Sequence, residues 1–103
     1  MTVVPYRRRA RLVFSDKMLF EDGTIYQIKV WSVDCSVPPS GHRYKYSLYF
    51  GYPGERIVAY DNECGKGNHK HIRGAEYPYA FVSLAQLIDD FGDDVERVTG
   101  RRL

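Results

Sequence analysis

Apolar and polar residues alternate with a period of two over much of the first half of the chain, which is the pattern of strands that bury one face. Four segments carry this alternation, and they are residues 10–20, 24–33, 44–50 and 56–60. They are rich in β-branched and aromatic residues, which favour strands. In the second segment Ile28 and Val30 are expected to face one way and Lys29 the other. The buried side of the first strand is predicted to comprise Leu12, Phe14, Met18 and Phe20.

Turn signals separate these segments and predict the order in which the strands pair. Glu21-Asp22-Gly23 and Tyr52-Pro53-Gly54-Glu55 are typical of tight turns. Pro38 and Pro39 fix φ and lack an amide donor, so residues 34–41 are predicted to form a connecting loop. Consecutive strands joined in this way are expected to form an antiparallel meander.

The apolar period lengthens to three and four residues near the end of the chain, which predicts a helix. The apolar positions are Leu84, Leu87, Ile88, Phe91, Val95 and Val98. Ser83 and Gln86 form a capping-box pattern at the start, while Gly92 weakens the middle. The apolar stripe can cover one face of the sheet. We therefore predict a small two-layer α+β domain, in which about four antiparallel strands pack against a C-terminal amphipathic helix.

Length and composition predict a single domain. A chain of 103 residues with 44% apolar residues can build one modest core, so residues 1–103 are assigned to one domain. No apolar run is long enough to span a bilayer, and the basic start lacks a secretory signal, which predicts a cytoplasmic protein without membrane contact. Cys35 and Cys64 are then expected to be free thiols.

Charge is segregated along the chain, although the formal net charge is only +2. The basic residues near the start are Arg7, Arg8, Arg9 and Arg11. The acidic residues of the predicted helix are Asp89, Asp90, Asp93, Asp94 and Glu96. A basic surface suits nucleic-acid phosphates, and an acidic helix face suits a basic partner, with plain solvated surface as the alternative for both.

Residues 60–73 hold the densest set of chemically active side chains in the sequence. His69 and His71 are one residue apart, so in extended backbone both imidazoles project to one side and Lys70 to the other. Cleavage of an RNA phosphodiester without a metal needs a base for the 2′-hydroxyl, an acid for the leaving oxygen and cations for the phosphorane. The two histidines suit the base and acid roles, in either order.

Neighbouring residues suit supporting roles in the same chemistry. Asp61 can orient a histidine through its ring N–H, and Lys66 and Arg73 can supply positive charge. Since the segment follows the predicted fourth strand, its side chains are expected at the rim of the sheet. The residues assigned to substrate binding are Asn62, Gly65, Gly67, Lys70, Arg7, Arg8 and Arg9.

The same segment offers residues that suit other chemistries. Zinc accepts the ligand types offered by Cys64, Asp61, His69 and His71. Lys66 and Lys70 would repel a dication, and a lone cysteine is a weak anchor, so no metal and no other cofactor is assigned. A further alternative is that the segment is a solvated turn without a catalytic role. Another is that Cys64 acts as a nucleophile with His69 as its base. A nucleotide-binding P-loop is disfavoured because no Ser or Thr follows Lys66.

Three aromatic or imidazole side chains lie outside this segment and bear on function. Trp31 and Tyr49 fall on the phase opposite the main apolar set, which makes them candidates for stacking on bases. The alternative is a sheet buried on both faces. His42 follows the Pro-rich segment without a companion motif and is predicted to be an ordinary loop histidine.

Several of these strings together resemble the TumE family, the toxin half of a toxin–antitoxin system. The resemblance is carried by Trp31, by residues 44–51 (YKYSLYFG), by Tyr60-Asp61-Asn62-Glu63 with Gly65-Lys66-Gly67 and His69-Lys70-His71, by residues 76–81 (EYPYAF) and by residues 86–91 (QLIDDF). It covers most of the chain after the first turn.

The resemblance implies a small growth-inhibiting toxin that a cognate antitoxin with a helix-turn-helix DNA-binding domain neutralises. Many such toxins are ribonucleases, which agrees with the His/Lys/Arg chemistry and predicts a metal-independent endoribonuclease acting on RNA or on the ribosome. The alternatives are a non-catalytic module that blocks a translation or replication target, and a metal-dependent or nucleotide-modifying toxin. The first strand could also pair with a second copy or with the antitoxin.

Overall fold

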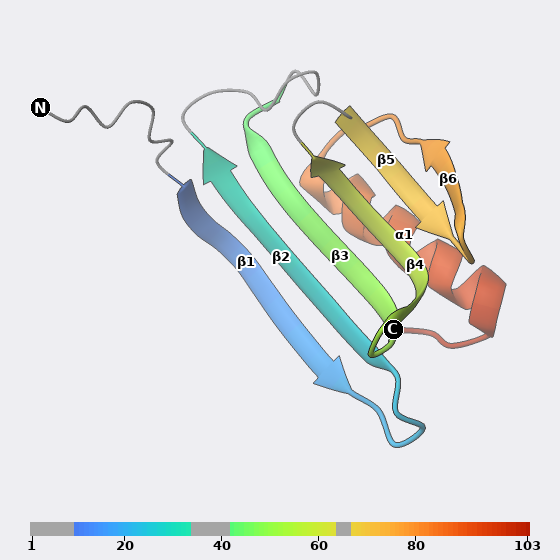
Figure 1. Ribbon diagram of the computed structural model, residues 1–103. Helices are drawn as coiled ribbons and strands as arrows, with labels where there is room; N and C mark the ends of the chain where they lie inside the picture. Colours follow the sequence, from blue (N-terminus) through green and yellow to red (C-terminus); the bar gives the residue numbers. More distant parts are fainter. Residues whose placement is uncertain (1–9, 34–41, 64–66) are drawn as a thin grey trace, which may run out of the picture.

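Six antiparallel strands form one sheet in a computed structural model that describes residues 10–33, 42–63 and 67–103 (Figure 1). The strands pair in chain order, each with the next. Their bounds are β1 Ala10–Leu19, β2 Ile25–Val33, β3 Tyr44–Tyr52, β4 Glu55–Glu63, β5 Gly67–Ile72 and β6 Ala75–Pro78, followed by the helix α1 Leu84–Thr99. The predicted α+β architecture, with an antiparallel meander and a C-terminal helix, is confirmed.

The sheet has two strands more than the pattern predicted. β4 continues through Asp61 and Asn62 to Glu63, and β5 then returns beside it. β6 is only four residues long and ends at Pro78. The polar composition of β5 hid it, because the backbone of β4 offers hydrogen bonds to a neighbour whatever side chains that neighbour carries.

The core lies between α1 and the face of the sheet that α1 covers, which we call the helix face. Figure 1 shows α1 behind the half of the sheet that contains β4 and β5. The predicted alternation in β2 and β3 is confirmed, with one set of side chains buried against α1. The buried apolar cluster comprises Ile28, Val30, Tyr46, Leu48, Phe50, Ile57, Val58, Tyr60, Leu87, Phe91 and Val95.

The first strand departs from the prediction, because every residue of β1 is exposed. A register shift between Leu12 and Phe14 places Leu12 opposite Trp31 and Phe14 opposite Val30, so these two side chains lie on opposite faces. The expected single buried face of β1 is therefore wrong. The helix contacts β4 and does not extend over β1, which leaves Met18 half-exposed.

The start of α1 matches the predicted cap. Ser83 has extended backbone, and its Oγ accepts a hydrogen bond of 3.1 Å from the backbone N–H of Gln86. Gly100 closes the helix with φ +80°, and its N–H donates to the carbonyl of Glu96. In the described part of the chain, no helix is long and apolar enough to cross a membrane.

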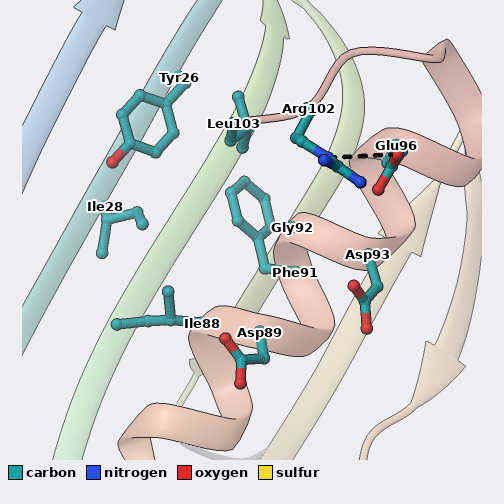
Figure 2. Close-up of a pocket in the computed structure, with 10 residues that line it drawn as sticks. All are labelled: Tyr26, Ile28, Ile88, Asp89, Phe91, Gly92, Asp93, Glu96, Arg102 and Leu103. Carbon is teal, nitrogen blue, oxygen red and sulfur yellow. Dashed lines mark ion pairs between the residues drawn. The ribbon is translucent and has the colours of Figure 1, made fainter.

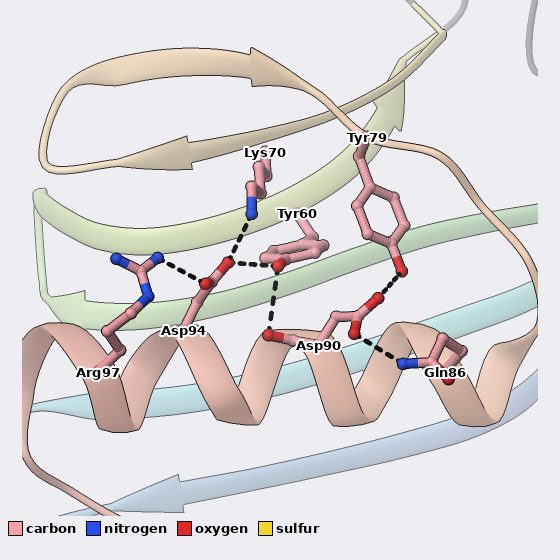
Figure 3. A network of polar contacts seen from close by, with 7 residues as sticks. All are labelled: Tyr60, Lys70, Tyr79, Gln86, Asp90, Asp94 and Arg97. Atoms are coloured by element: carbon pink, nitrogen blue, oxygen red, sulfur yellow. Dashed lines mark hydrogen bonds and ion pairs between the residues drawn. The ribbon is translucent and has the colours of Figure 1, made fainter.

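A buried carboxylate, Asp94, fastens α1 to the sheet (Figure 3). The Tyr60 hydroxyl donates to Asp94 Oδ2, and Lys70 Nζ lies 3.0 Å from the same oxygen. Arg97 binds the other oxygen at 2.7 Å. Burial alone would raise the pKa of Asp94, but hydrogen bonds from Tyr60, Arg97 and Lys70 outweigh it and hold that pKa below its ordinary value. At Asp94, α1 is therefore held to the sheet by ion pairs and a hydrogen bond and not by apolar packing.

A second carboxylate, Asp90, extends the network one turn earlier in α1. Its Oδ2 accepts a hydrogen bond of 2.6 Å from the Tyr79 hydroxyl, and its Oδ1 one of 2.7 Å from Gln86. The Tyr79 contact ties the segment after β6 to the helix (Figure 3). Two of the acidic residues that the sequence placed on a partner-binding face are thus structural.

Candidate functional site

Asp61, His69 and His71 lie together on the face of the sheet opposite α1, which we call the open face. Asp61 of β4 pairs with His69 of β5, and Ala59 of β4 pairs with His71. Residues paired in this way share a face, so the two imidazoles and the carboxylate are neighbours. The ring centroids of His69 and His71 are 5.0 Å apart, and Nε2 of His69 is 2.5 Å from Oδ1 of Asp61. The expected alignment of both imidazoles on one side of extended backbone is confirmed.

The ring of His69 is held from two sides. Nδ1 lies 3.0 Å from the carbonyl oxygen of Gly67, and Nε2 faces the Asp61 carboxylate. The carbonyl oxygen of Gly67 can only accept, so Nδ1 donates to it, whereas the contact of Nε2 with Asp61 Oδ1 is close but lacks hydrogen-bond geometry. Gly67 begins β5 with φ +78°, a conformation that favours glycine. The residue is thus needed for the backbone turn that presents its carbonyl to His69.

His71 occupies a different electrostatic environment although it is only two residues away. Burial lowers the pKa of His71 below its ordinary value, and the positive charges of Arg56 and His69 lower it further. Asp61 and Glu76 act in the opposite direction and do not reverse the shift. The neutral imidazole, which can accept a proton, is therefore the form favoured near neutral pH.

The open face carries cations on several of its strands, besides the carboxylates Asp61 and Glu76 next to the histidines. The register places Lys29 beside Ser47, and Ser47 beside Asp61, so one row of side chains runs from β2 to the histidines. Arg56 pairs with Gly51 on the same face. The basic side chains that the described strands carry on this face are Lys17, Lys29, Lys45 and Arg56. Such a surface attracts a phosphate backbone.

Three residues that the sequence assigned to the site lie elsewhere. Lys70 is on the helix face, where it pairs with Asp94. Asn62 is fully buried there, and its amide accepts from the N–H of Tyr46 and donates to the carbonyl of Tyr44. Arg73 sits in the turn between β5 and β6 with φ +46°, and its guanidinium lies 3.5 Å from the carbonyl of Val98. These positions place all three away from the histidines.

The remaining assignments fall partly outside the described residues. Gly67 is part of the site through its backbone. Cys64, Gly65, Lys66 and the arginines at 7–9 lie outside the described residues. The expected position of the site at the rim of the sheet is wrong for Asp61, His69 and His71, which lie within the paired strands β4 and β5. This gives the three side chains a firmer scaffold than a loop would provide.

Arg56, Lys29 and Lys45 are the side chains that sequence reasoning missed. They are far from the histidines in the chain, and no motif links them. The alternation could have located two of them, because Lys29 and Lys45 project from the face of their strands opposite the apolar residues. Arg56 could not be placed from phase, since a register shift occurs next to it in β4.

The same three side chains offer a set of metal-binding atoms. One ligand atom each from Asp61, His69 and His71 lies within 4.8 Å of the others. Two imidazoles and a carboxylate are donors that zinc accepts, so the donor chemistry fits a divalent cation. The direct contact between Asp61 and His69 would have to open to admit the ion. Arg56, whose charge already acts on His71, opposes a dication at this point.

His42 lies on the helix face and plays a packing role. Its ring stacks on Phe81 with centroids 3.9 Å apart. Nδ1 accepts from the N–H of Tyr44, which leaves Nε2 to donate to Oδ1 of Asn68. The histidine thus anchors the segment before α1 and is not part of the open-face site.

The family model described as Toxin TumE matches residues 2–99, nearly the whole chain. No match was found among curated proteins or among solved structures.

Proposed function

Because the chain belongs to the TumE family of toxins, we propose that it acts as a metal-independent endoribonuclease whose centre is the Asp61–His69–His71 cluster. The single observation that carries this proposal is the pairing of two histidines in different environments on a cation-rich sheet face. Acid–base cleavage of RNA needs one imidazole that accepts a proton and one that donates it. The contrast between the two rings supports that division.

We assign the base role to His71 and the acid role to His69. The neutral ring of His71 removes the proton from the 2′-hydroxyl, and the 2′-oxygen attacks phosphorus. The bond to the 5′-oxygen breaks, and that oxygen takes a proton from His69, which Asp61 and the Gly67 carbonyl hold in place. The products are a 2′,3′-cyclic phosphate and a 5′-hydroxyl. Arg56 offsets the charge that grows on the phosphorane.

Purified protein should cleave RNA in the presence of EDTA, since no step above requires a metal. We expect cleavage of total RNA, or of messenger RNA on translating ribosomes, with 2′,3′-cyclic phosphate ends in the products. Cleavage that requires ribosomes would identify a ribosome-dependent enzyme. Absence of cleavage in both substrates, with and without divalent ions, would replace this proposal by the non-catalytic binding module.

A metal-dependent toxin is the second candidate, and the three converging ligand atoms favour it. In this case the ion would supply a Lewis acid beside the phosphate. The EDTA experiment separates the candidates, because activity that EDTA abolishes and zinc or manganese restores belongs to the second. Zinc that inhibits an EDTA-resistant activity would instead support the acid–base assignment, since the ion would occupy both imidazoles.

Membership of a toxin family implies a cognate antitoxin, and we propose that it carries a helix-turn-helix domain and docks on the acidic side of α1. A groove of about 370 Å³ lies between α1 and β2 on the helix face (Figure 2). Its floor is apolar and formed by Tyr26, Ile28, Ile88 and Phe91. Its rim carries Asp89, Asp93 and Glu96, of which Glu96 lies 3.6 Å from Arg102.

Next to this groove, none of the described residues covers the helix face of β1. Phe14 and Met18 of β1 share the helix face and are 42% and 49% exposed. An apolar strip next to an acidic rim fits an amphipathic helix with Lys or Arg along one edge. We therefore propose that the antitoxin places such a helix alongside α1, over β1 and β2.

Filling the groove should weaken the toxin–antitoxin complex. A Cβ at Gly92 would meet nothing within 4 Å, so a side chain can leave α1 at this position, and Gly92→Trp should place an indole where the antitoxin helix would lie. We expect a loss of affinity of at least about tenfold by calorimetry, and a similar loss for Asp93→Lys at low salt. Glu21→Lys, an equal charge change in the turn after β1, is the control. Unchanged affinity in Gly92→Trp would exclude the groove.

A further inference from the structure

Trp31 is a large aromatic side chain on the open face that the core does not use. It lies opposite Lys45 of β3 and Leu12 of β1, on the same face as the histidines. It belongs neither to the buried apolar cluster nor to the partly buried side chains packed against that cluster. In the described part of the chain, packing against the core beneath α1 therefore does not explain why a tryptophan stands at this position.

A small cavity adjoins this indole. Its volume is about 230 Å³, and it is lined by Ala10, Trp31, Val33 and Lys45. Three of these four residues are apolar, and the fourth is an exposed lysine. A flat indole beside an aliphatic wall and an ammonium group fits a nucleobase with its phosphate, because bases stack on aromatic rings while lysine binds the backbone.

The strand register fixes how this cavity is related to the catalytic cluster. The row that contains His69 and Asp61 continues through Ser47 to Lys29. Trp31 is two residues beyond Lys29 on the same face, and three strand spacings separate β2 from β5. With spacings of about 4.8 Å between strands and about 3.4 Å per residue, Trp31 lies roughly 16 Å from His69 along the sheet. A nucleotide chain of a few units spans that distance.

We propose that Trp31 and Lys45 form a base-stacking subsite for single-stranded RNA, remote from the scissile phosphate. This inference rests on the proposed ribonuclease function and specifies its substrate as an extended single strand. The strand crosses the open face from the histidines over Ser47 and Lys29 to Trp31. A duplex would not present a free base face to the indole, so double-stranded RNA binds the subsite poorly.

The sequence contains a single tryptophan, so intrinsic indole fluorescence reports on this subsite alone. The experiment titrates the His71→Ala variant with octauridylate, and with the same oligonucleotide annealed to octaadenylate. We expect quenching by the single strand and little by the duplex. Trp31→Ala should weaken single-strand binding by about 5- to 150-fold, measured by anisotropy of a labelled oligonucleotide, as loss of one stacked base does.

Two variants control for folding and for unspecific loss of aromatic surface. Trp31→Phe keeps a stacking ring and should bind octauridylate within a few-fold of the parent protein. Tyr77 of β6 is exposed and lies beside Lys70 on the helix face, away from the proposed subsite. Tyr77→Ala should therefore leave binding of octauridylate unchanged. In cleavage assays Trp31→Ala should raise KM for an octanucleotide with little change in kcat, and should not alter cleavage of a dinucleotide.

The outcomes separate this inference from the function on which it rests. Octauridylate that binds without quenching, and equally well to Trp31→Ala, would overturn the subsite while His71-dependent cleavage still supported the ribonuclease. Absence of both binding and cleavage would overturn both. Quenching together with weaker binding in Trp31→Ala, and with binding retained in Trp31→Phe, is the result that the stacking subsite requires.

Discussion

The His71→Ala variant is expected to cleave RNA about 10² to 10⁴ times more slowly than the parent protein, because removal of a general base forfeits a contribution of that size. The side chain is buried at the sheet surface and is not part of the apolar core cluster, so the fold should persist. The measurement is the initial rate of cleavage of a labelled RNA, with circular dichroism to verify folding. Cleavage within a few-fold of the parent rate would exclude His71 as the base.

The pH dependence gives the same assignment a second, sharper test. The base must be neutral, so the rate should fall as pH drops through the pKa of His71, which burial, Arg56 and His69 place below its ordinary value near 6.5. Removing the charge of Arg56 in Arg56→Gln should move this acidic limb to higher pH. Glu76→Gln should move it to lower pH, because Glu76 raises the pKa of His71. Shifts in the same direction would contradict the electrostatic account.

The Asp94→Ala variant should lose about 3 to 5 kcal/mol of unfolding free energy, which is the usual cost of breaking a buried ion pair. The substitution leaves the Tyr60 hydroxyl and the Lys70 ammonium without the carboxylate that both contact. A domain of this size has a total stability of only about 5 to 15 kcal/mol. Urea unfolding measures the change, and Asp93→Ala is the matched control, since exposed Asp93 should cost within about 0.5 kcal/mol.

The contribution of Asp94 should also depend on pH in a defined direction. Its pKa in the folded protein is held below the value of 3.8 expected in the unfolded chain. A depressed carboxyl pKa contributes stability above the unfolded value and loses it as pH falls through the folded value. The parent protein and Asp94→Asn should therefore differ most near neutral pH and converge in strong acid, below the depressed pKa of Asp94. A constant difference at all pH values would assign the effect to packing alone.

The sequence predicted those features that depend on local periodicity. Alternation in β2 and β3 located both strands and their buried faces, and the Ser83 cap with the apolar stripe located α1. It failed for β1, where the pattern of Leu12 and Phe14 could not reveal the register shift or the limited reach of the helix. Whether an apolar face is buried depends on another layer, and one chain segment carries no information about that layer.

The candidate site shows the same division. The pairing of His69 with His71, and the role of Asp61 as a partner of one ring, followed from spacing and chemistry. Lys70 and Asn62 were assigned to substrate binding, but the structure places both side chains on the helix face, where Asp94 and the β3 backbone hold them. Their polarity marked a need for partners, and nothing in the sequence could distinguish a protein partner from RNA.

The order of the strands has a consequence for synthesis on the ribosome. Each strand pairs with its predecessor, so successive hairpins can form while the chain emerges, with short loops to close. The helix that buries Tyr60 and neutralises Lys70 follows all six strands. In a nascent chain both histidines therefore exist before the helix that supports their strands has been made, and the proposed site reaches its final form only once α1 has been synthesised.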